Sequence, residues 1–421
     1  MAKKNKGKSD DKSRPEYDFS NTNQSTEKPI SDSKRRIKYD FNPNKKETDD
    51  GKILEQKSNY NFSDEKIEIK SSDYNNPQLL LDKVEIYLSE YIVGQEKART
   101  LVSQLLVNHA LSSYGSFINL DKALLLIGPT GTGKSYIPQT ASKLLGFPFV
   151  DFDLTSVTTA GYQGANIDDS LELLIKESAK FFSKEEIKEG KDLEYASWGI
   201  INLDEFDKIS ANKNFQGKDV SAEVQLQLLR FLEGGTYILK DGRTFNTSNL
   251  LFFMTGAFDG IENKIDNVDR SLPSLIDFEV EPEINKNNKL NVGTDELIEY
   301  GINKQLLGRM IPVILDDLTK KSLYHILTEI KDSKTGKSLL DSTKEQVQLF
   351  YPNITIKPEV LRNLVSEAYE EGNGARTLHK KTNILRYSIV DYLRKTNADS
   401  NEKIIINNEL AQKAKNLYEG K

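Results

Sequence analysis

A glycine-rich loop with a lysine occupies residues 128–135, which read Gly-Pro-Thr-Gly-Thr-Gly-Lys-Ser directly after an apolar run at 123–127. Glycines let such a loop curl until successive backbone N–H groups point inward at a phosphate. Lys134 can then reach the β and γ phosphates, and the Ser135 hydroxyl can ligate Mg²⁺. A ligand-free glycine turn is the alternative, but a strand-like run before the loop and a helical stretch after it favour a nucleoside triphosphate site. The residues expected to bind it are Gly128, Pro129, Thr130, Gly131, Thr132, Gly133, Lys134 and Ser135.

Two carboxylates, Asp204 and Glu205, come directly after a second apolar run at residues 198–203. An acidic pair at a strand end is often only solvated surface. Downstream of a phosphate loop, however, such a pair can hold Mg²⁺ beside a catalytic carboxylate. We therefore expect Asp204 to position Mg²⁺ and Glu205 to orient and polarise the attacking water. Thr255 ends a third apolar run, residues 250–254, and is a further candidate catalytic residue.

The elements that must position these side chains alternate between apolar strands and amphipathic helices. An apolar helical stripe covers residues 80–88, and a second amphipathic helix extending through His109 precedes the strand at 123–127. Strands that alternate with helices predict an α/β fold with a parallel sheet. Ligands gather at the carboxyl ends of such strands, where all three signatures lie.

Composition limits the possible classes of protein. The chain has 421 residues, 37% of them hydrophobic, a net charge of −6 and no cysteine. It is long enough for two or three domains, and its acidic balance argues against a generally basic surface that coats nucleic acid. No apolar run has membrane-spanning length and no secretory signal follows Met1, so we expect a cytoplasmic protein without membrane contact. The lack of cysteine excludes disulfides and thiolate zinc sites.

Residues 1–77 are dense in Lys, Asp, Asn, Ser and Glu, and such a segment cannot bury enough apolar surface to offset the entropy lost on folding. We expect a disordered tail. A short Tyr-Asp/Asn-Phe pattern occurs in it three times, at Glu16–Ser20, Lys38–Asn42 and Asn59–Ser63. The repeats are either linear motifs that bind an adaptor or substrate, which we favour, or chance in a Tyr- and Asn-rich segment.

The order of the motifs along the chain resembles that of the ClpX-type AAA+ protein unfoldases over residues 78 to about 400. The motifs are Tyr91–Gln95, the phosphate loop, Gly161–Gly164, Leu203–Ile209, Asp219–Ser221, Leu232–Gly234, Gly256–Phe258, Leu307–Arg309 and Gly374–Arg376. The related HslU proteins carry a large inserted domain, for which there is no room between Gly164 and Trp198. The resemblance implies a large α/β ATPase domain at 78–313 and a small, mainly helical domain at 314–421. It also implies a homohexamer that uses ATP and Mg²⁺ to thread unfolded or tagged proteins through a central pore.

The resemblance also implies roles for five residues. Ile92 and Val93 match the pair that contacts adenine, and Tyr162 matches the pore tyrosine that grips the translocating polypeptide. Arg309 resembles the arginine finger presented to a neighbouring subunit's nucleotide, and Arg376 the sensor arginine of the small domain. The simpler alternatives are a turn residue at 162, a surface charge at 309 and a helix-start cation at 376.

Three departures from the family pattern affect the expected partners. We expect no N-terminal zinc-binding domain, since the chain has no cysteine, and a short hairpin at residues 234–244 in place of a basic pore-entrance loop. The peptidase-docking tripeptide has only the counterpart Ile276-Asp277-Phe278, whose aspartate adds charge to an apolar plug. A ClpP-type peptidase partner and a peptidase-independent remodelling chaperone both stay open. A nucleic-acid-remodelling AAA+ ATPase is a third possibility, disfavoured by the acidic charge and the aromatic pore loop.

Overall fold

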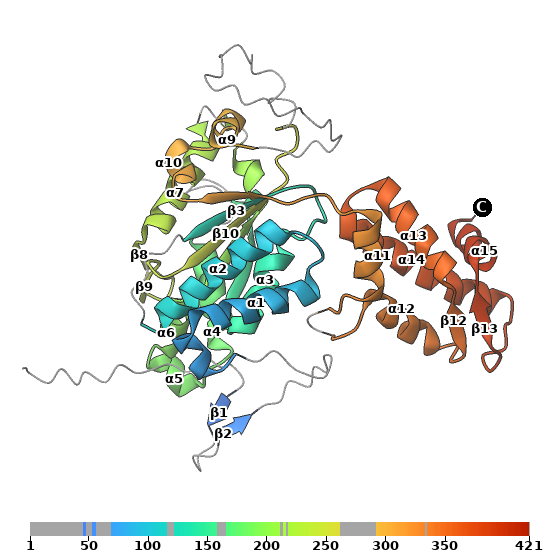
Figure 1. Cartoon of the computed structure of the whole chain (residues 1–421). Helices are drawn as coiled ribbons and strands as arrows, with labels where there is room; N and C mark the ends of the chain where they lie inside the picture. The colour runs from blue at the N-terminus through green and yellow to red at the C-terminus, as the bar shows by residue number, and fades with distance from the viewer. Residues whose placement is uncertain are drawn as a thin grey trace, which may run out of the picture. The chain divides into compact units, whose positions relative to one another are not determined.

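The computed structural model describes residues 45–47, 53–55, 69–115, 122–157, 166–210, 214–215, 218–261, 292–332 and 335–420 (Figure 1). Tyr162, the tripeptide at 276–278 and the three Tyr-Asp/Asn-Phe repeats lie outside these ranges.

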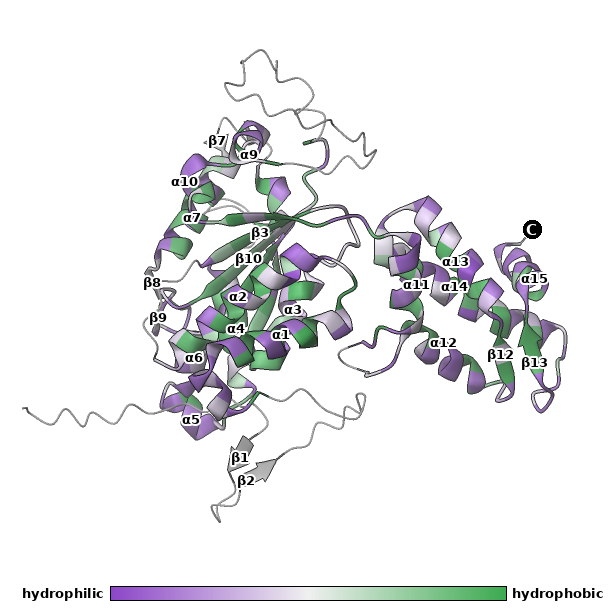
Figure 2. Ribbon diagram, in the orientation of Figure 1, coloured by the Kyte–Doolittle hydropathy of each residue, from purple (hydrophilic) through white to green (hydrophobic). Residues whose placement is uncertain are grey.

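A five-stranded sheet of order β11-β3-β10-β5-β4 forms the centre of the larger part, and all its neighbouring strands are parallel. The strands are β3 (Ala123–Ile127), β4 (Phe149–Asp153), β5 (Ile200–Asp204), β10 (Leu251–Gly256) and β11 (Ile311–Ile314). Every residue of β3 and β10 is buried, as expected for strands covered on both faces. Figure 2 shows these strands as mainly hydrophobic. The predicted parallel α/β fold is confirmed.

Successive residues of β3 face two different cores, since side chains alternate along a strand. Leu124 and Leu126 pack with α1 (Pro77–Tyr91), α2 (Glu96–Ser113) and α3 (Tyr136–Leu145). Leu125 and its alternate neighbours pack with α4 (Asp169–Ala179) and α7 (Val220–Glu233). Further described helices of this part are α5 (Lys184–Lys188), α6 (Lys191–Ala196), α9 (Thr294–Tyr300), α10 (Lys304–Leu307), η2 (Leu154–Ser156) and η3 (Phe206–Ile209).

The structured residues of this part begin before Pro77, the predicted end of the tail. The 3₁₀ helix η1 (Ser71–Asn75) precedes α1, and the buried Asp73 carboxylate accepts hydrogen bonds from the Lys70 N–H and the Lys83 ammonium, both at 2.7 Å. These bonds tie η1 to α1, so the boundary lies at Ile69 or earlier. Further upstream, β1 (Lys45–Glu47) and β2 (Ile53–Glu55) pair antiparallel within the segment predicted to be disordered.

Two antiparallel pairs accompany the sheet. The backbone pairs β6 (Asn214–Phe215) with β7 (Lys218–Asp219) and β8 (Thr236–Ile238) with β9 (Thr244–Asn246). The second pair is the predicted short hairpin at 234–244. Its basic residues are engaged, because Lys240 pairs with Asp169 at 2.5 Å and Arg243 with Asp192 at 3.0 Å.

The C-terminal part is mainly helical and has its own core, which includes Leu323, Val347, Leu378 and Ile389. Its helices are α11 (Lys320–Thr328), α12 (Leu339–Gln348), α13 (Pro358–Glu371), α14 (Gly374–Lys395) and α15 (Asn408–Glu419). A parallel pair, β12 (Ile354–Ile356) and β13 (Ile404–Ile406), completes it. Among the described residues, none of the helices has both the length and the apolar character needed to cross a membrane.

Candidate active site

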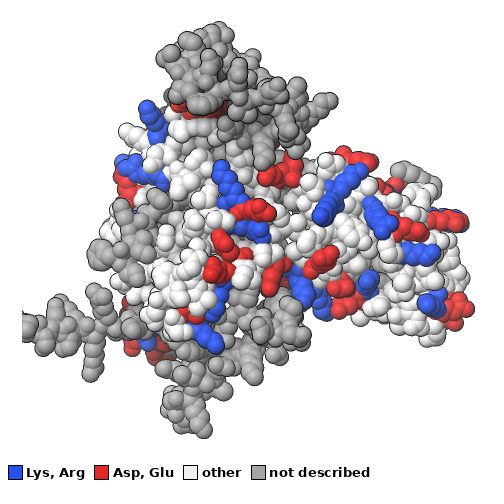
Figure 3. All heavy atoms as spheres, in the orientation of Figure 1, with Lys and Arg blue, Asp and Glu red and all other residues white. Residues whose placement is uncertain are grey.

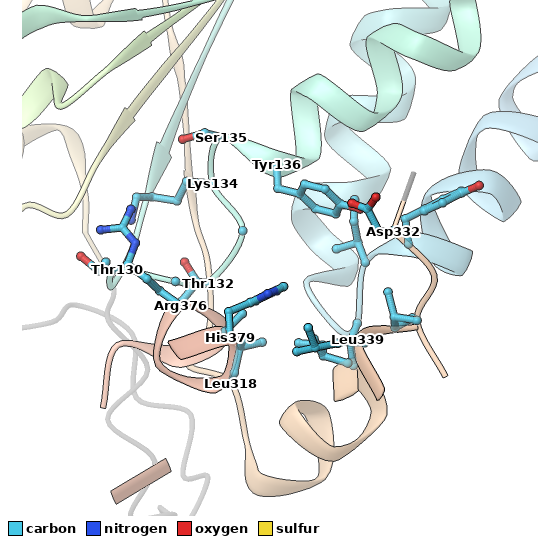
Figure 4. A pocket seen from close by; sticks show the side chains of 18 of the residues that line it. Thr130, Thr132, Lys134, Ser135, Tyr136, Leu318, Asp332, Leu339, Arg376 and His379 are labelled. Carbon is cyan, nitrogen blue, oxygen red and sulfur yellow. The ribbon is translucent and has the colours of Figure 1, made fainter. Parts of the chain in front are cut away.

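A cavity of about 770 Å³ opens beside the phosphate loop (Figure 4). Its wall combines the loop with the ends of β5 and β10, the segment that follows α1, and residues near α11, α12 and α14. The predicted site residues that line it are Ile92, Val93, Thr130, Gly131, Thr132, Gly133, Lys134, Ser135, Asp204, Glu205 and Arg376. Ile92 and Arg376, which are more than 280 positions apart in the sequence, therefore line the same cavity.

The side chain of Lys134 is bonded to the backbone of its own phosphate loop. Gly131 and Gly133 have φ values of +81° and +100°, a backbone region that favours glycine. The loop turns so that the Lys134 ammonium donates hydrogen bonds to the carbonyl oxygens of Gly128 at 2.7 Å and Pro129 at 2.8 Å. Burial lowers the pKa of Lys134, while the nearby Asp204 opposes that shift. Gly128 and Pro129 do not line the cavity, but they hold the lysine whose cation would meet the phosphates.

Asp204, the last residue of β5, has both carboxylate oxygens engaged. Its Oδ1 accepts from the Glu205 N–H at 3.0 Å and from the Thr255 hydroxyl, and its Oδ2 accepts from the Ser135 hydroxyl at 3.3 Å. A carboxylate and a hydroxyl oxygen are the hard ligands that Mg²⁺ prefers. Among the described residues no group of three or more His, Cys, Asp or Glu side chains forms a metal cage. Ser135 and Asp204 thus fit a Mg²⁺ ion whose other ligands are phosphate oxygens and water.

Glu205 directly follows and takes the left-handed conformation, with φ +57°. A non-glycine residue rarely adopts this conformation, and strained backbone of this kind clusters at functional sites. The turn ends β5 and starts η3, and Glu205 lines the cavity beside Asp204.

Arg376 reaches the cavity from the first turn of α14. Figure 4 shows its side chain on the same side of the cavity as Lys134. The two cations are close enough for the charge of Arg376 to favour a lower pKa of Lys134. An arginine and a lysine that line one cavity suit the negatively charged phosphates of a nucleoside triphosphate.

The cavity also has apolar lining residues, with polar ones such as Asp332 and Ser338 among them. Ile92 is buried at the end of α1, Val93 is half-buried, and both line the cavity. Lining residues that the sequence analysis missed include Tyr136, Leu318, Ile326, Ile330, Leu339 and His379. Apolar walls around a few polar groups suit a flat nucleobase. Burial lowers the pKa of His379, and the nearby Asp332 opposes that shift, so a neutral imidazole is favoured there. Only Tyr136 had a sequence signal, as the neighbour of Ser135.

Thr255 and Arg309, two further predicted site residues, do not line the cavity. Thr255 is fully buried behind Asp204 and touches the site only through the hydrogen bond to that carboxylate. Arg309 does not line the cavity; it pairs with Glu233 at 2.5 Å, and its side chain is 40% exposed. Tyr162 falls outside the described residues.

The sequence of the chain is similar to those of known proteins. The family model described as AAA domain (Cdc48 subfamily) matches residues 121–313. The ATP-dependent Clp protease ATP-binding subunit ClpX of Bacteroides fragilis is 31% identical over 323 residues, which cover 70% of this chain and 72% of that protein. The protein of the same name from Treponema denticola is 30% identical over 314 residues, which cover 69% and 72%.

The identity extends beyond the AAA domain, and the phosphate loop, the acidic pair and the α14 arginine meet in one cavity. The chain is an ATPase with the AAA+ fold and belongs to the ClpX family.

Proposed function

We propose that this chain is one subunit of a homohexameric protein unfoldase, which uses Mg-ATP to thread polypeptides through a central pore lined by Tyr162. The observation that carries the proposal is the cavity itself, which joins the phosphate loop, the acidic pair and Arg376. The large domain at 78–313 and the small domain at 314–421 would both contribute to it. A site of this composition performs phosphoryl transfer to water by positioning and charge compensation.

The residues of the cavity have distinct roles in this proposal. Lys134 exchanges the carbonyl oxygens of Gly128 and Pro129 for phosphate oxygens, while Glu205 orients the attacking water and accepts its proton. Bound Mg²⁺ would supply positive charge next to the β and γ phosphates, held by Ser135 and Asp204. Ile92 and Val93 would contact the adenine.

The position of Arg309 is an argument for the proposed ring of subunits. It lies outside the cavity of its own chain and its guanidinium is partly exposed, so in this conformation it cannot compensate charge on its own nucleotide. Its partner Glu233 is itself 47% exposed, and a surface ion pair of this kind is weak, about 0–1 kcal/mol. Arg309 can therefore leave Glu233 and act on the nucleotide of an adjacent subunit.

The relatives are named as ATP-binding subunits of an ATP-dependent protease. We accordingly propose a ClpP-type peptidase as a partner. The aspartate in Ile276-Asp277-Phe278 favours a second candidate, a remodelling chaperone that works without a peptidase. Nucleic acid is a poorer partner, because the net charge is −6 and the face in Figure 3 mixes acidic and basic side chains.

Two substitutions test the proposal by separating binding from turnover. Glu205→Gln should bind ATP normally and lose about 10²- to 10⁴-fold in hydrolysis rate, roughly 3–5 kcal/mol of barrier. Lys134→Ala should weaken nucleotide binding itself. Binding is measured with a fluorescent nucleotide and turnover by phosphate release. A wild-type hydrolysis rate in Glu205→Gln would remove Glu205 from the mechanism.

A further inference from the structure

Polar side chains form a continuous chain across three neighbouring strands, behind the Asp204 carboxylate. The Asn202 amide nitrogen on β5 donates to the Asp151 carboxylate on β4 at 2.6 Å and lies 3.5 Å from the Thr255 hydroxyl on β10. Thr255 in turn donates to Oδ1 of Asp204. The order of the chain is thus Asp151, Asn202, Thr255, Asp204.

Strand register accounts for this alignment. Asp151 pairs with Asn202 across β4 and β5, and Phe253 pairs with Asn202 across β10 and β5. Residues two apart point to the same face of a strand, so Thr255 lies on the face of Phe253 and Asp204 on the face of Asn202. All four side chains therefore lie on one face of the sheet, towards the carboxyl ends of its strands.

The other residues that β5 and β10 present on this face are apolar, since Ile200, Leu251 and Phe253 pack under α1 to α3. Asn202 and Thr255 are both completely buried. Asparagine is depleted in strands, and a buried amide is costly to fold unless it is bonded. An aliphatic residue at position 202 would give a more stable fold. We therefore infer that the amide of Asn202 has a role in the active site.

Hydrogen-bond direction shows what the amide can do. A threonine hydroxyl has a single hydrogen. Because Asn202 presents an N–H to the hydroxyl oxygen of Thr255, that hydrogen is directed to Asp204. Oδ1 of Asp204 then has two donors, Thr255 and the Glu205 N–H, and Oδ2 is left to face Ser135. Asp151 fixes the amide with its nitrogen toward Thr255.

We propose that Asp151 and Asn202 are positioning residues that orient Asp204 for the Mg-nucleotide. They act through Thr255 and touch neither nucleotide nor metal themselves. This inference deepens the proposed function and rests on it. Groups that orient a metal ligand typically change metal affinity or activity by about 10- to 100-fold when they are removed.

The test measures Mg²⁺ dependence of nucleotide binding on the full chain. Wild type, Asn202→Leu and Asp151→Asn are titrated with Mg²⁺ in the presence of a fluorescent, non-hydrolysable ATP analogue. Both variants should need about 10-fold more Mg²⁺ for half-maximal binding and should lose kcat with little change in KM. Analogue binding in EDTA should stay at the wild-type level, because the phosphate loop is intact.

Asp153→Asn is the matched control. Asp153 lies on the same strand face two residues further, where its carboxylate accepts hydrogen bonds from the N–H and the hydroxyl of Thr155. Its Mg²⁺ titration should match wild type. Unchanged titrations in Asp151→Asn and Asn202→Leu would overturn the proposal, as would an equal shift in Asp153→Asn. If Asn202→Leu does not fold, Asp151→Asn alone decides. A wild-type protein that fails to bind Mg-nucleotide would instead contradict the proposed function.

Discussion

The backbone N–H of Ala375 donates a hydrogen bond to the carbonyl oxygen of Gly131, with 3.0 Å between the two atoms. Ala375 is the second residue of α14, whose N-cap, Asn373, makes no side-chain capping bond. The phosphate loop therefore satisfies one of the N–H groups that a helix start leaves unpaired. The approach is close, because a Cβ on Gly131 would lie 2.0 Å from the Asn373 carbonyl oxygen. A movement of the loop on nucleotide binding would therefore displace α14, the helix that contains Arg376.

We predict that Ala375→Pro weakens nucleotide binding. Proline is tolerated in the first turn of a helix but has no N–H, so the bond to Gly131 is lost while α14 persists. The loss of one hydrogen bond, about 1 kcal/mol, corresponds to roughly 5-fold in affinity. Ala375→Ser keeps the N–H and is the control. Equal affinities in both variants, measured with a fluorescent nucleotide, would show that the contact has no energetic role.

Mixing subunits tests the arginine finger. Arg309→Ala should bind ATP but hydrolyse it poorly, by about 10³-fold if the guanidinium stabilises the transition state. Adding Lys134→Ala subunits should restore part of the activity, at interfaces that combine an intact finger with an intact phosphate site. Glu233→Ala, which frees Arg309 from its partner, should retain hydrolysis. Full activity of Arg309→Ala in a monomeric form would exclude the role.

The strands β3, β5 and β10 were predictable because each is a short, mainly apolar run. The edge strand β4 alternates apolar and acidic residues, and neither it nor β11 was predicted. The phosphate loop and the acidic pair were predictable because their chemistry depends on adjacent residues. The cavity wall at Leu318 and Leu339 was not, because apolar residues of amphipathic helices look alike whether they face a core or a ligand. The link between Asp151 and Asn202 depends on strand register, which the spacing of residues along the chain does not reveal.

Protonation of His109 should make stability depend on pH. The ring is buried in α2, its Nε2 lies 2.9 Å from the Trp198 carbonyl oxygen, and burial lowers its pKa to about 4. An unfolded histidine titrates near 6.5, so only the unfolded state gains a proton between these values. The contribution is fully present above pH 6.5 and is lost as the pH falls toward 4, by roughly 3 kcal/mol.

His109→Gln keeps an N–H donor for the Trp198 carbonyl and removes the titration. Urea unfolding of both proteins at pH 7.5 and pH 5 should therefore show a smaller loss of stability in the variant. Parallel losses in the two proteins would assign the acid sensitivity to other groups.

The N-terminal repeats should recruit a partner. Six tails on a hexamer could bind it by avidity even if each motif is weak. Removing residues 1–66 spares Ile69, which packs against the core, and the Asp73 to Lys83 ion pair. The truncated protein should keep basal ATPase activity and lose the partner in a pull-down. Serine at Tyr17, Phe19, Tyr39, Phe41, Tyr60 and Phe62 in the full chain should have the same effect. Unchanged recovery with both proteins would identify the tail as a non-binding segment.

The central claim is that ATP hydrolysis at this site unfolds proteins, and a fluorescence assay tests it most directly. The substrate is a stable fluorescent protein fused to a polypeptide that Glu205→Gln retains in the presence of ATP. Wild-type protein with Mg-ATP should abolish the fluorescence, and Glu205→Gln should leave it intact. Tyr162→Ala should hydrolyse ATP yet unfold the substrate far more slowly, because it lacks the aromatic grip. Fluorescence that persists while wild-type protein hydrolyses ATP would contradict the account.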